Sequence, residues 1–188
     1  MAKLSTKMVE ELNSQMGREL SAANQYLAMA IHLDERSLKE LANFFYTQAE
    51  EQRAHAMKFL QYVLQANEKP VIPAIPEPVA NFESLEQIAE MGLAQEQEVT
   101  HCIHELVDLA LSEKDHTTNH FLQWFVEEQL EEEATFTELL DVVRQSENLL
   151  LVEQYVFRQK PGTDLGGEKG ISEPVAPILR KTLVACSR

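Results

Sequence analysis

The positions of the helix-breaking residues constrain this chain more than any other feature of its sequence. Its glycines and prolines are segregated: residues 1–69 hold one Gly and no Pro, and residues 79–160 also hold one Gly and no Pro. Four prolines gather in residues 70–78, and the remaining breakers lie beyond residue 160. Because proline and glycine interrupt or weaken helices, the sequence predicts two long helical halves joined by a proline-rich connection.

Each half is interrupted once, so we expect four long helices. The interruptions are the stretches HLDERSLKE and SEKDHTT, where the helical spacing of apolar residues breaks. The expected helices cover residues 6–34, 37–65, 84–112 and 116–145, and a short fifth segment, NLLLVEQYVFR, follows. Residues suited to capping the helix starts are Ser37 with Glu40, Ser84 with Gln87, and Asp115 or Thr117.

The connections between these helices are short, long and short, which is typical of an all-α four-helix bundle. Short turns make antiparallel pairs, and the long connection crosses the bundle between the two pairs. At about 1.5 Å per residue each helix is about 42 Å long, a distance that roughly 18 connecting residues can span. We expect residues 1–158 to form this single domain with its short fifth helix, and residues 159–188, which contain Gly and Pro, to form a mobile C-terminal extension.

Composition excludes several classes of function. The 188 residues include 16 Lys and Arg against 31 Asp and Glu, and the formal charge of −15 argues against a nucleic-acid partner. No apolar run approaches the roughly 18 residues of a membrane span, and the first residues lack the apolar core of a secretory signal. The two cysteines form no CxxC motif, which favours a reducing compartment. The sequence therefore predicts a cytoplasmic protein without a membrane partner.

Polar residues interrupt the middle of every stripe that the four helices would bury. Positions spaced alternately three and four apart are otherwise mainly apolar in each helix. Counted from the predicted turns, the interruptions lie 12 to 18 residues from the turn of their own pair, which places them at a similar height in the bundle. These residues are Glu19, Gln52, His55, Glu96, Glu128 and Glu132.

This polar level is more consistent with a metal site than with isolated core or surface residues. A single buried glutamate is usually a hydrated edge residue, and a single histidine is usually a hydrogen-bonded core residue. Several carboxylates facing one another without Lys or Arg on the stripes would cost several kcal/mol each unless protonated, hydrated or bound to metal. Carboxylates with one imidazole suit iron. Tyr26, two turns from Glu19, is either plain core or a hydroxyl beside the metal. The other histidines, expected at the surface or as caps, are His32, His101, His104, His116 and His120.

Four motifs carry a resemblance to a known family. They are REL around Glu19 with Tyr26 seven residues later, AEEQRAHAMKFLQYV, LAQEQEVTHCIHEL and FLQWFVEEQLEEEATF. With them, residues 4–158 resemble the bacterial non-haem ferritins. The resemblance implies a ferroxidase that oxidises Fe(II) to Fe(III) with dioxygen or peroxide. It also implies a hollow homo-oligomeric shell of 24 subunits that stores iron as a ferric mineral.

The resemblance also implies the iron ligands. Iron site A would use Glu19, a bridging residue at position 52 and His55, and site B would use the same bridge with Glu96 and with Gln129 nearby. A third iron site would map to Glu51, Glu128, Glu131 and Glu132. Haem is not expected, because Arg53 stands where bacterioferritins place their haem-binding Met.

One residue departs from the family pattern. The ferritin motif Glu-x-x-His reads Gln52-Arg53-Ala54-His55 here, so the bridging carboxylate is replaced by a neutral amide. Either Glu51 turns inward to supply the charge, or binding of two irons weakens. The second interpretation predicts a storage or scaffold subunit with reduced ferroxidase activity. A third, a small soluble di-iron oxidoreductase, predicts a dimer without mineral.

Overall fold

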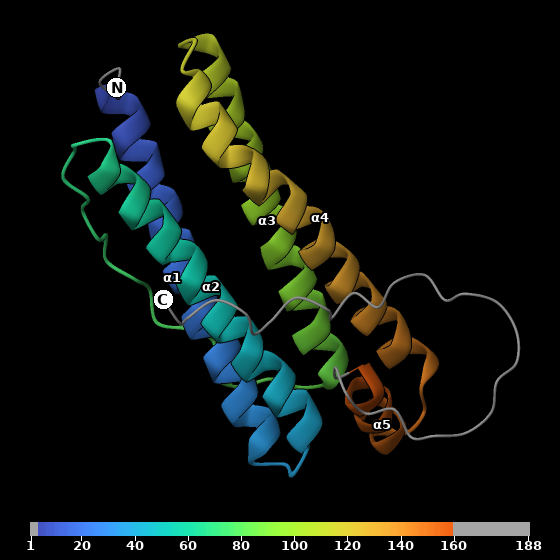
Figure 1. Cartoon of the computed structure of the whole chain (residues 1–188). Coiled ribbons are helices and arrows are strands. Elements are labelled where there is room, and N and C mark those ends of the chain that lie inside the picture. Colours follow the sequence, from blue (N-terminus) through green and yellow to red (C-terminus); the bar gives the residue numbers. More distant parts are fainter. Residues whose placement is uncertain (1–3, 160–188) are drawn as a thin grey trace, which may run out of the picture.

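The computed structural model describes residues 4–159, which form five helices and no strand (Figure 1). The helices are α1 (Thr6–Asp34), α2 (Lys39–Gln65), α3 (Leu85–Ser112), α4 (His116–Gln145) and α5 (Leu149–Gln159). The sequence predicted the ends of the four long helices to within two residues, and the all-α class is confirmed. Within residues 4–159, no helix has the length and apolar character needed to cross a membrane. The predicted C-terminal extension lies almost entirely outside the described residues.

The helices are arranged as two antiparallel pairs, α1 with α2 and α3 with α4, and α1 also contacts α3 (Figure 1). The crossover, residues 66–84, runs back along α1, as the long connection predicted. Two side chains of α1 hold it there: Asn13 Oδ1 accepts from the Val71 N–H at 3.0 Å, and the Gln25 amide bonds both the N–H and the carbonyl of Val79 at 2.9 Å. The short α5 packs against the ends of α2 and α4.

The first three helices end in the same way, with one residue in the left-handed backbone region. The φ angles of these residues, 56–63°, are unusual outside glycine. In each case the following N–H bonds the carbonyl five residues earlier, at 2.8–3.1 Å, which closes the last turn. The residues are Ser37, Asn67 and Lys114.

The predicted helix starts are partly confirmed. Ser84 caps α3 by accepting from the Gln87 N–H at 3.1 Å, and Asp115 caps α4 by accepting from the Thr118 N–H at 3.0 Å. Of the two alternatives at the start of α4, the structure therefore selects Asp115 over Thr117.

The predicted capping box of Ser37 and Glu40 is wrong. Ser37 belongs to the motif that ends α1, and no side chain of the neighbouring turn caps α2. The cap comes instead from α5, where the Glu153 carboxylate accepts from the N–H groups of Glu40 and Leu41 at 3.1 and 2.8 Å. A carboxylate near a helix N-terminus is stabilising, so this contact also attaches the fifth helix to the bundle.

The hydrophobic core is divided into two clusters that lie on either side of the polar level. One cluster, near the α1–α2 turn, includes Tyr26, Phe45 and Phe136; the other includes Phe59 and Phe125. Aromatic rings join α2 to α4 in both clusters, with centroids 6.1 Å apart for Phe45 and Phe136 and 4.2 Å apart for Phe59 and Phe125. The polar side chains are therefore enclosed above and below by apolar packing, which strengthens their mutual electrostatic interactions.

Candidate metal centre

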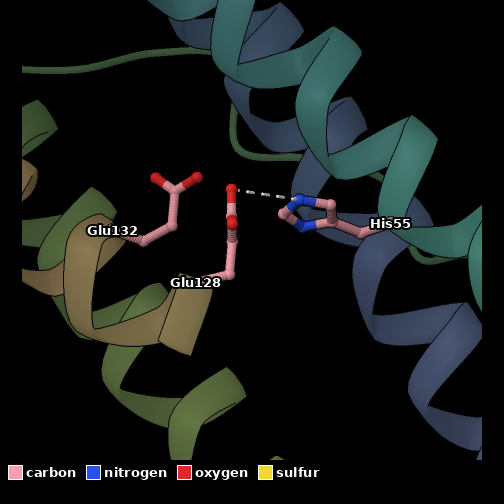
Figure 2. A group of neighbouring side chains, drawn as sticks. All are labelled: His55, Glu128 and Glu132. Carbon is pink, nitrogen blue, oxygen red and sulfur yellow. Dashed lines mark ion pairs between the residues drawn. The ribbon is translucent and has the colours of Figure 1, made fainter. Parts of the chain in front are cut away.

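The helices bring the predicted polar residues together in the middle of the bundle. Of the metal ligands predicted by sequence, six are at most 6% exposed: Glu19, Gln52, His55, Glu96, Gln129 and Glu132. Figure 2 shows His55 of α2 facing Glu128 and Glu132 of α4, and ligand atoms of these three side chains lie within 4.8 Å of one another. The described part of the chain thus contains a histidine and carboxylate cluster at the level that the sequence indicated.

The imidazole of His55 lies between two carboxylates. Its Nδ1 is 3.7 Å from Glu19 Oε2, and its Nε2 is 4.0 Å from Glu128 Oε1. Both distances are too long for hydrogen bonds. Among the described residues, His55 Nδ1, Glu19 Oε2 and Gln52 Oε1 are buried without a hydrogen-bond partner. Because buried polar atoms are almost always paired, three unpaired atoms at one level of the bundle, two of them 3.7 Å apart, indicate positions for a bound ion.

The second oxygen of Glu19 is held by a residue that the sequence analysis did not single out. Gln15, which is fully buried, donates from its Nε2 to Glu19 Oε1 at 2.8 Å. The two residues lie four apart and therefore share a helix face. That spacing was the available signal, but a glutamine one turn from a ligand is common on any helix surface. Gln15 orients the carboxylate so that its other oxygen is left for a ligand.

Glu96 has both of its oxygens occupied by protein donors. Its Oε1 accepts from the Tyr26 hydroxyl and from Gln52 Nε2 at 3.2 Å, and its Oε2 accepts from Gln129 Nε2 at 3.1 Å. Burial raises the pKa of Glu96 to about 7, while the hydrogen bonds from Tyr26 and Gln129 oppose the rise. Burial and the charge of Glu96 hold the pKa of Tyr26 well above its usual value of 10, so Tyr26 remains a donor.

Tyr26 has an apolar ring in the core and a hydroxyl at the polar level. Its ring is fully buried and stacks on Phe136, with the centroids 5.3 Å apart. Its hydroxyl points to Glu96 and also lies 3.4 Å from the Gly92 carbonyl. The residue is part of the apolar core and, at the same time, a hydroxyl within the polar level.

The acidic residues of α4 extend the cluster outward. Burial raises the pKa of Glu132 well above its usual range, and the charges of neighbouring carboxylates, first Glu96 and then Glu51 and Glu128, raise it further. Glu128 is partly exposed, and Glu131 is exposed on the same helix. The predicted third-site residues therefore do not all share the closed volume of the bundle.

Glu51, the residue that could supply the missing carboxylate, accepts a hydrogen bond within its own helix. It is half-buried, and its Oε2 accepts from Gln48 Nε2 at 2.7 Å on the same helix. Gln52 is the residue that contacts Glu96, at 3.2 Å. Of the two alternatives left open by the sequence, the contacts of Glu51 do not favour an inward turn toward Glu96.

A cation and the single tryptophan lie beside His55, and the sequence analysis missed both. Lys58 Nζ lies 2.8 Å from the centroid of the Trp124 ring, and that ring meets the His55 imidazole edge to face at 5.3 Å. Burial lowers the pKa of Lys58, and the charge of Glu128 opposes this. Lys58 follows His55 by three residues, so the helical spacing was visible, but the tryptophan partner on another helix was not.

The other histidines mostly match expectation, with one correction. His101, His104, His116 and His120 are exposed, as predicted. His32 was expected at the surface or as a cap, but only 8% of it is exposed, and its ring meets Phe82 of the crossover edge to face. The crossover covers the end of α1, a long-range contact that helical spacing does not reveal.

The chain is similar to known proteins in sequence as well as in structure. Residues 9–146 match the family model described as a ferritin-like domain. The bacterial non-heme ferritin of Staphylococcus saprophyticus subsp. saprophyticus is 44% identical over 138 residues, 73% of this chain and 83% of that protein. That of Staphylococcus aureus strain MRSA252 is 41% identical over 71% of this chain and 80% of that protein.

Solved structures agree with the sequence relatives. An open pore ferritin from the hyperthermophilic archaeon Archaeoglobus fulgidus is similar at a TM-score of 0.81 with 38% identity, over 83% of this chain and 98% of that chain. A humanized archaeal ferritin is similar at a TM-score of 0.80 with 37% identity, over 82% of this chain and 96% of that chain.

Proposed function

This chain belongs to the ferritin family, and from that premise we propose that it stores iron after oxidising Fe(II) to Fe(III) at the buried cluster. The observation that carries the proposal is the set of unpaired ligand atoms at one level of the bundle, Glu19 Oε2, Gln52 Oε1 and His55 Nδ1. Oxygen ligands together with one imidazole nitrogen suit iron in both of its oxidation states, Fe(II) and Fe(III).

The negative charge of the carboxylates favours oxidation of Fe(II) to Fe(III) at the centre. Carboxylates bind Fe(III) more strongly than Fe(II), because the product ion carries one more positive charge. Two Fe(II) ions release two electrons, and one dioxygen molecule takes them up with two protons as hydrogen peroxide. The buried Glu96 and Glu132 hold protons more strongly than ordinary carboxyls, so metal binding is expected to release protons from the cluster.

We expect the chain to act as an assembled shell. The proposed assembly is a homo-oligomer of 24 subunits in the cytoplasm, with Fe(II) and dioxygen or peroxide as substrates and no haem. The ferritin relatives support an oligomer of this kind. A dimer that forms no mineral would instead favour the small di-iron oxidoreductase considered above.

A second candidate function is favoured by Gln52. In this alternative the chain is a storage subunit with little ferroxidase activity of its own, which deposits iron oxidised elsewhere. The amide at position 52 adds no negative charge to the centre and donates to Glu96 at 3.2 Å. Weaker binding of iron at the oxidation site would then slow catalysis without changing the fold.

The test is anaerobic loading of metal-free protein with Fe(II), followed by mixing with air-saturated buffer. Stopped-flow absorbance follows ferric formation, chemical analysis counts iron per chain, and light scattering with electron microscopy reports the shell and its mineral. A fast phase that saturates at a few irons per chain supports ferroxidase activity. Slow oxidation without saturation, in a shell that still fills with mineral, supports the storage subunit.

Two variants make the result specific to the cluster. His55→Ala removes the buried imidazole, whereas His101→Ala removes an exposed one whose side chain is 66% accessible. We expect the rate of the fast phase to fall at least tenfold in His55→Ala and to stay unchanged in His101→Ala. Equal oxidation by both variants and the wild type would show that iron is oxidised outside the bundle.

A further inference from the structure

We infer that the centre of this chain holds one metal ion, between Glu19 and His55, and that the Gln52 amide occupies the place of a second. The inference rests on the proposed metal centre and specifies how many ions it takes. It follows from a difference among the buried ligand atoms: some lack a hydrogen-bond partner, and others already have one. The Gln52 amide nitrogen donates to Glu96, whereas its oxygen is buried without a hydrogen-bond partner.

The first side has the ligands for one ion. His55 Nδ1 and Glu19 Oε2 are 3.7 Å apart and have no hydrogen-bond partner, so an ion about 2 Å from each fits between them. Gln52 lies one turn before His55 on the same face of α2, and its Oε1 is the third buried atom without a partner. The three side chains are 0–3% exposed. One carboxylate oxygen, one amide oxygen and one imidazole nitrogen make a built site.

The second side is already closed by hydrogen bonds. Gln52 Nε2 donates to Glu96 Oε1 at 3.2 Å, Tyr26 donates to the same oxygen, and Gln129 Nε2 donates to Glu96 Oε2 at 3.1 Å. An N–H group cannot bind a cation. Both donors to Glu96 Oε1 would have to move before an ion could bind that oxygen, and Gln52 would offer the ion no ligand atom on this side.

Turning the amide over does not create the second position. The amide oxygen would then face Oε1 of Glu96, and when that carboxylate is ionised, as metal binding requires, two acceptor oxygens about 3 Å apart repel. The NH₂ group would face the Glu19 and His55 atoms and remove a ligand from the first position. A carboxylate has two equivalent oxygens and serves both sides, whereas an amide has one oxygen and serves one side. The chemistry of residue 52 therefore sets the number of ions.

The experiment is to locate Zn²⁺, a redox-inert probe, in crystals of the metal-free full-length protein by anomalous scattering. Three proteins are compared: the wild type, Gln52→Glu, and the control Gln61→Glu. Gln61 is exposed on the same helix, nine residues after Gln52, so its substitution adds the same charge to α2 outside the centre. The number and position of the anomalous peaks near residues 19, 52, 55 and 96 are measured.

We expect one peak in the wild type, bonded to Glu19 and His55, and the same single peak in Gln61→Glu. We expect two peaks in Gln52→Glu, the second bonded to Glu96. Ions at the outer carboxylates of α4 are distinguished by position. In solution, calorimetric titration should show one additional tightly bound Zn²⁺ per chain in Gln52→Glu compared with the wild type.

The wild-type map alone can overturn the inference. A second wild-type peak within bonding distance of Glu96, or no peak between Glu19 and His55, contradicts it whether or not the variants fold. The proposed function fails separately. A wild-type protein with one centre ion that forms no mineral keeps this inference and loses iron storage, whereas two centre ions with fast oxidation keep the function and lose the inference.

Discussion

The raised pKa of the buried Glu96 predicts that the metal-free protein loses stability as the pH rises toward neutrality. The carboxyl has a pKa of about 7 in the folded chain, against an ordinary value of 4.5, and burial is the main cause. Between these values the folded chain keeps a proton that the unfolded chain has released. The stabilisation is therefore fully present below about pH 4.5 and is lost as the pH rises through about 7.

The magnitude follows from the same two values. Each pKa unit corresponds to about 1.4 kcal/mol, so a pKa raised from 4.5 to about 7 gives about 3 kcal/mol in total. About 2 kcal/mol of this is lost between pH 5.5 and 8, because part of the unfolded-state titration lies below that window. The raised pKa of Glu132 acts in the same direction.

The assay is urea unfolding in the presence of a metal chelator. The subunit concentration is kept fixed, because assembly adds to apparent stability. Wild type is compared with Glu96→Gln, and the compared quantity is the change in unfolding free energy from pH 5.5 to 8. The comparison is needed because His32, whose pKa is lowered by burial, changes stability in the opposite direction. Equal pH dependence in the two proteins, or a wild type that becomes more stable toward pH 8, would refute the reasoning.

Three further substitutions test individual contacts in the bundle. Gly92→Ala would place a Cβ 2.5 Å from Phe136 Cδ1; overpacking should outweigh the helix preference of alanine, and the urea midpoint should fall by the equivalent of about 1–2 kcal/mol. Glu153→Ala removes the carboxylate that caps α2, and hydrogen exchange at the start of α2 should accelerate about tenfold, whereas unchanged exchange would mean that water replaces the cap. Tyr26→Phe removes a donor that lowers the pKa of Glu96, so the pH midpoint of the stability loss should rise by about one unit, and an unchanged midpoint would contradict that role.

The bundle itself was predictable from local features of the sequence. All the prolines, and all the glycines except Gly17 and Gly92, lie outside the two helical halves, so helical spacing continues through each long segment and the ends fall near the breakers. Counting along a helix is counting distance, at about 1.5 Å per residue, so the level shared by Glu19, Gln52 and Glu96 followed from arithmetic. The structure places these residues together in the core.

Contacts between distant segments were not predictable in the same way. The cap on α2 comes from Glu153, more than 100 residues away, and not from the capping box that the local pattern indicated. His32 is buried by a crossover residue, and Lys58 lies over a tryptophan on another helix. Each depends on how elements pack, and many side chains with the same spacing make no such contact.

The sequence by itself determined that an amide stands at the position where ferritins carry a bridging carboxylate. It did not determine what that amide does, because the two sides of an amide differ and a rotation about one bond exchanges them. Only the tertiary structure brings Glu96, with its other donors Tyr26 and Gln129, to the N–H side of Gln52. In this environment the amide oxygen of Gln52 has no hydrogen-bond partner, because the ionised Glu96 carboxylate can pair only with the N–H side of the amide.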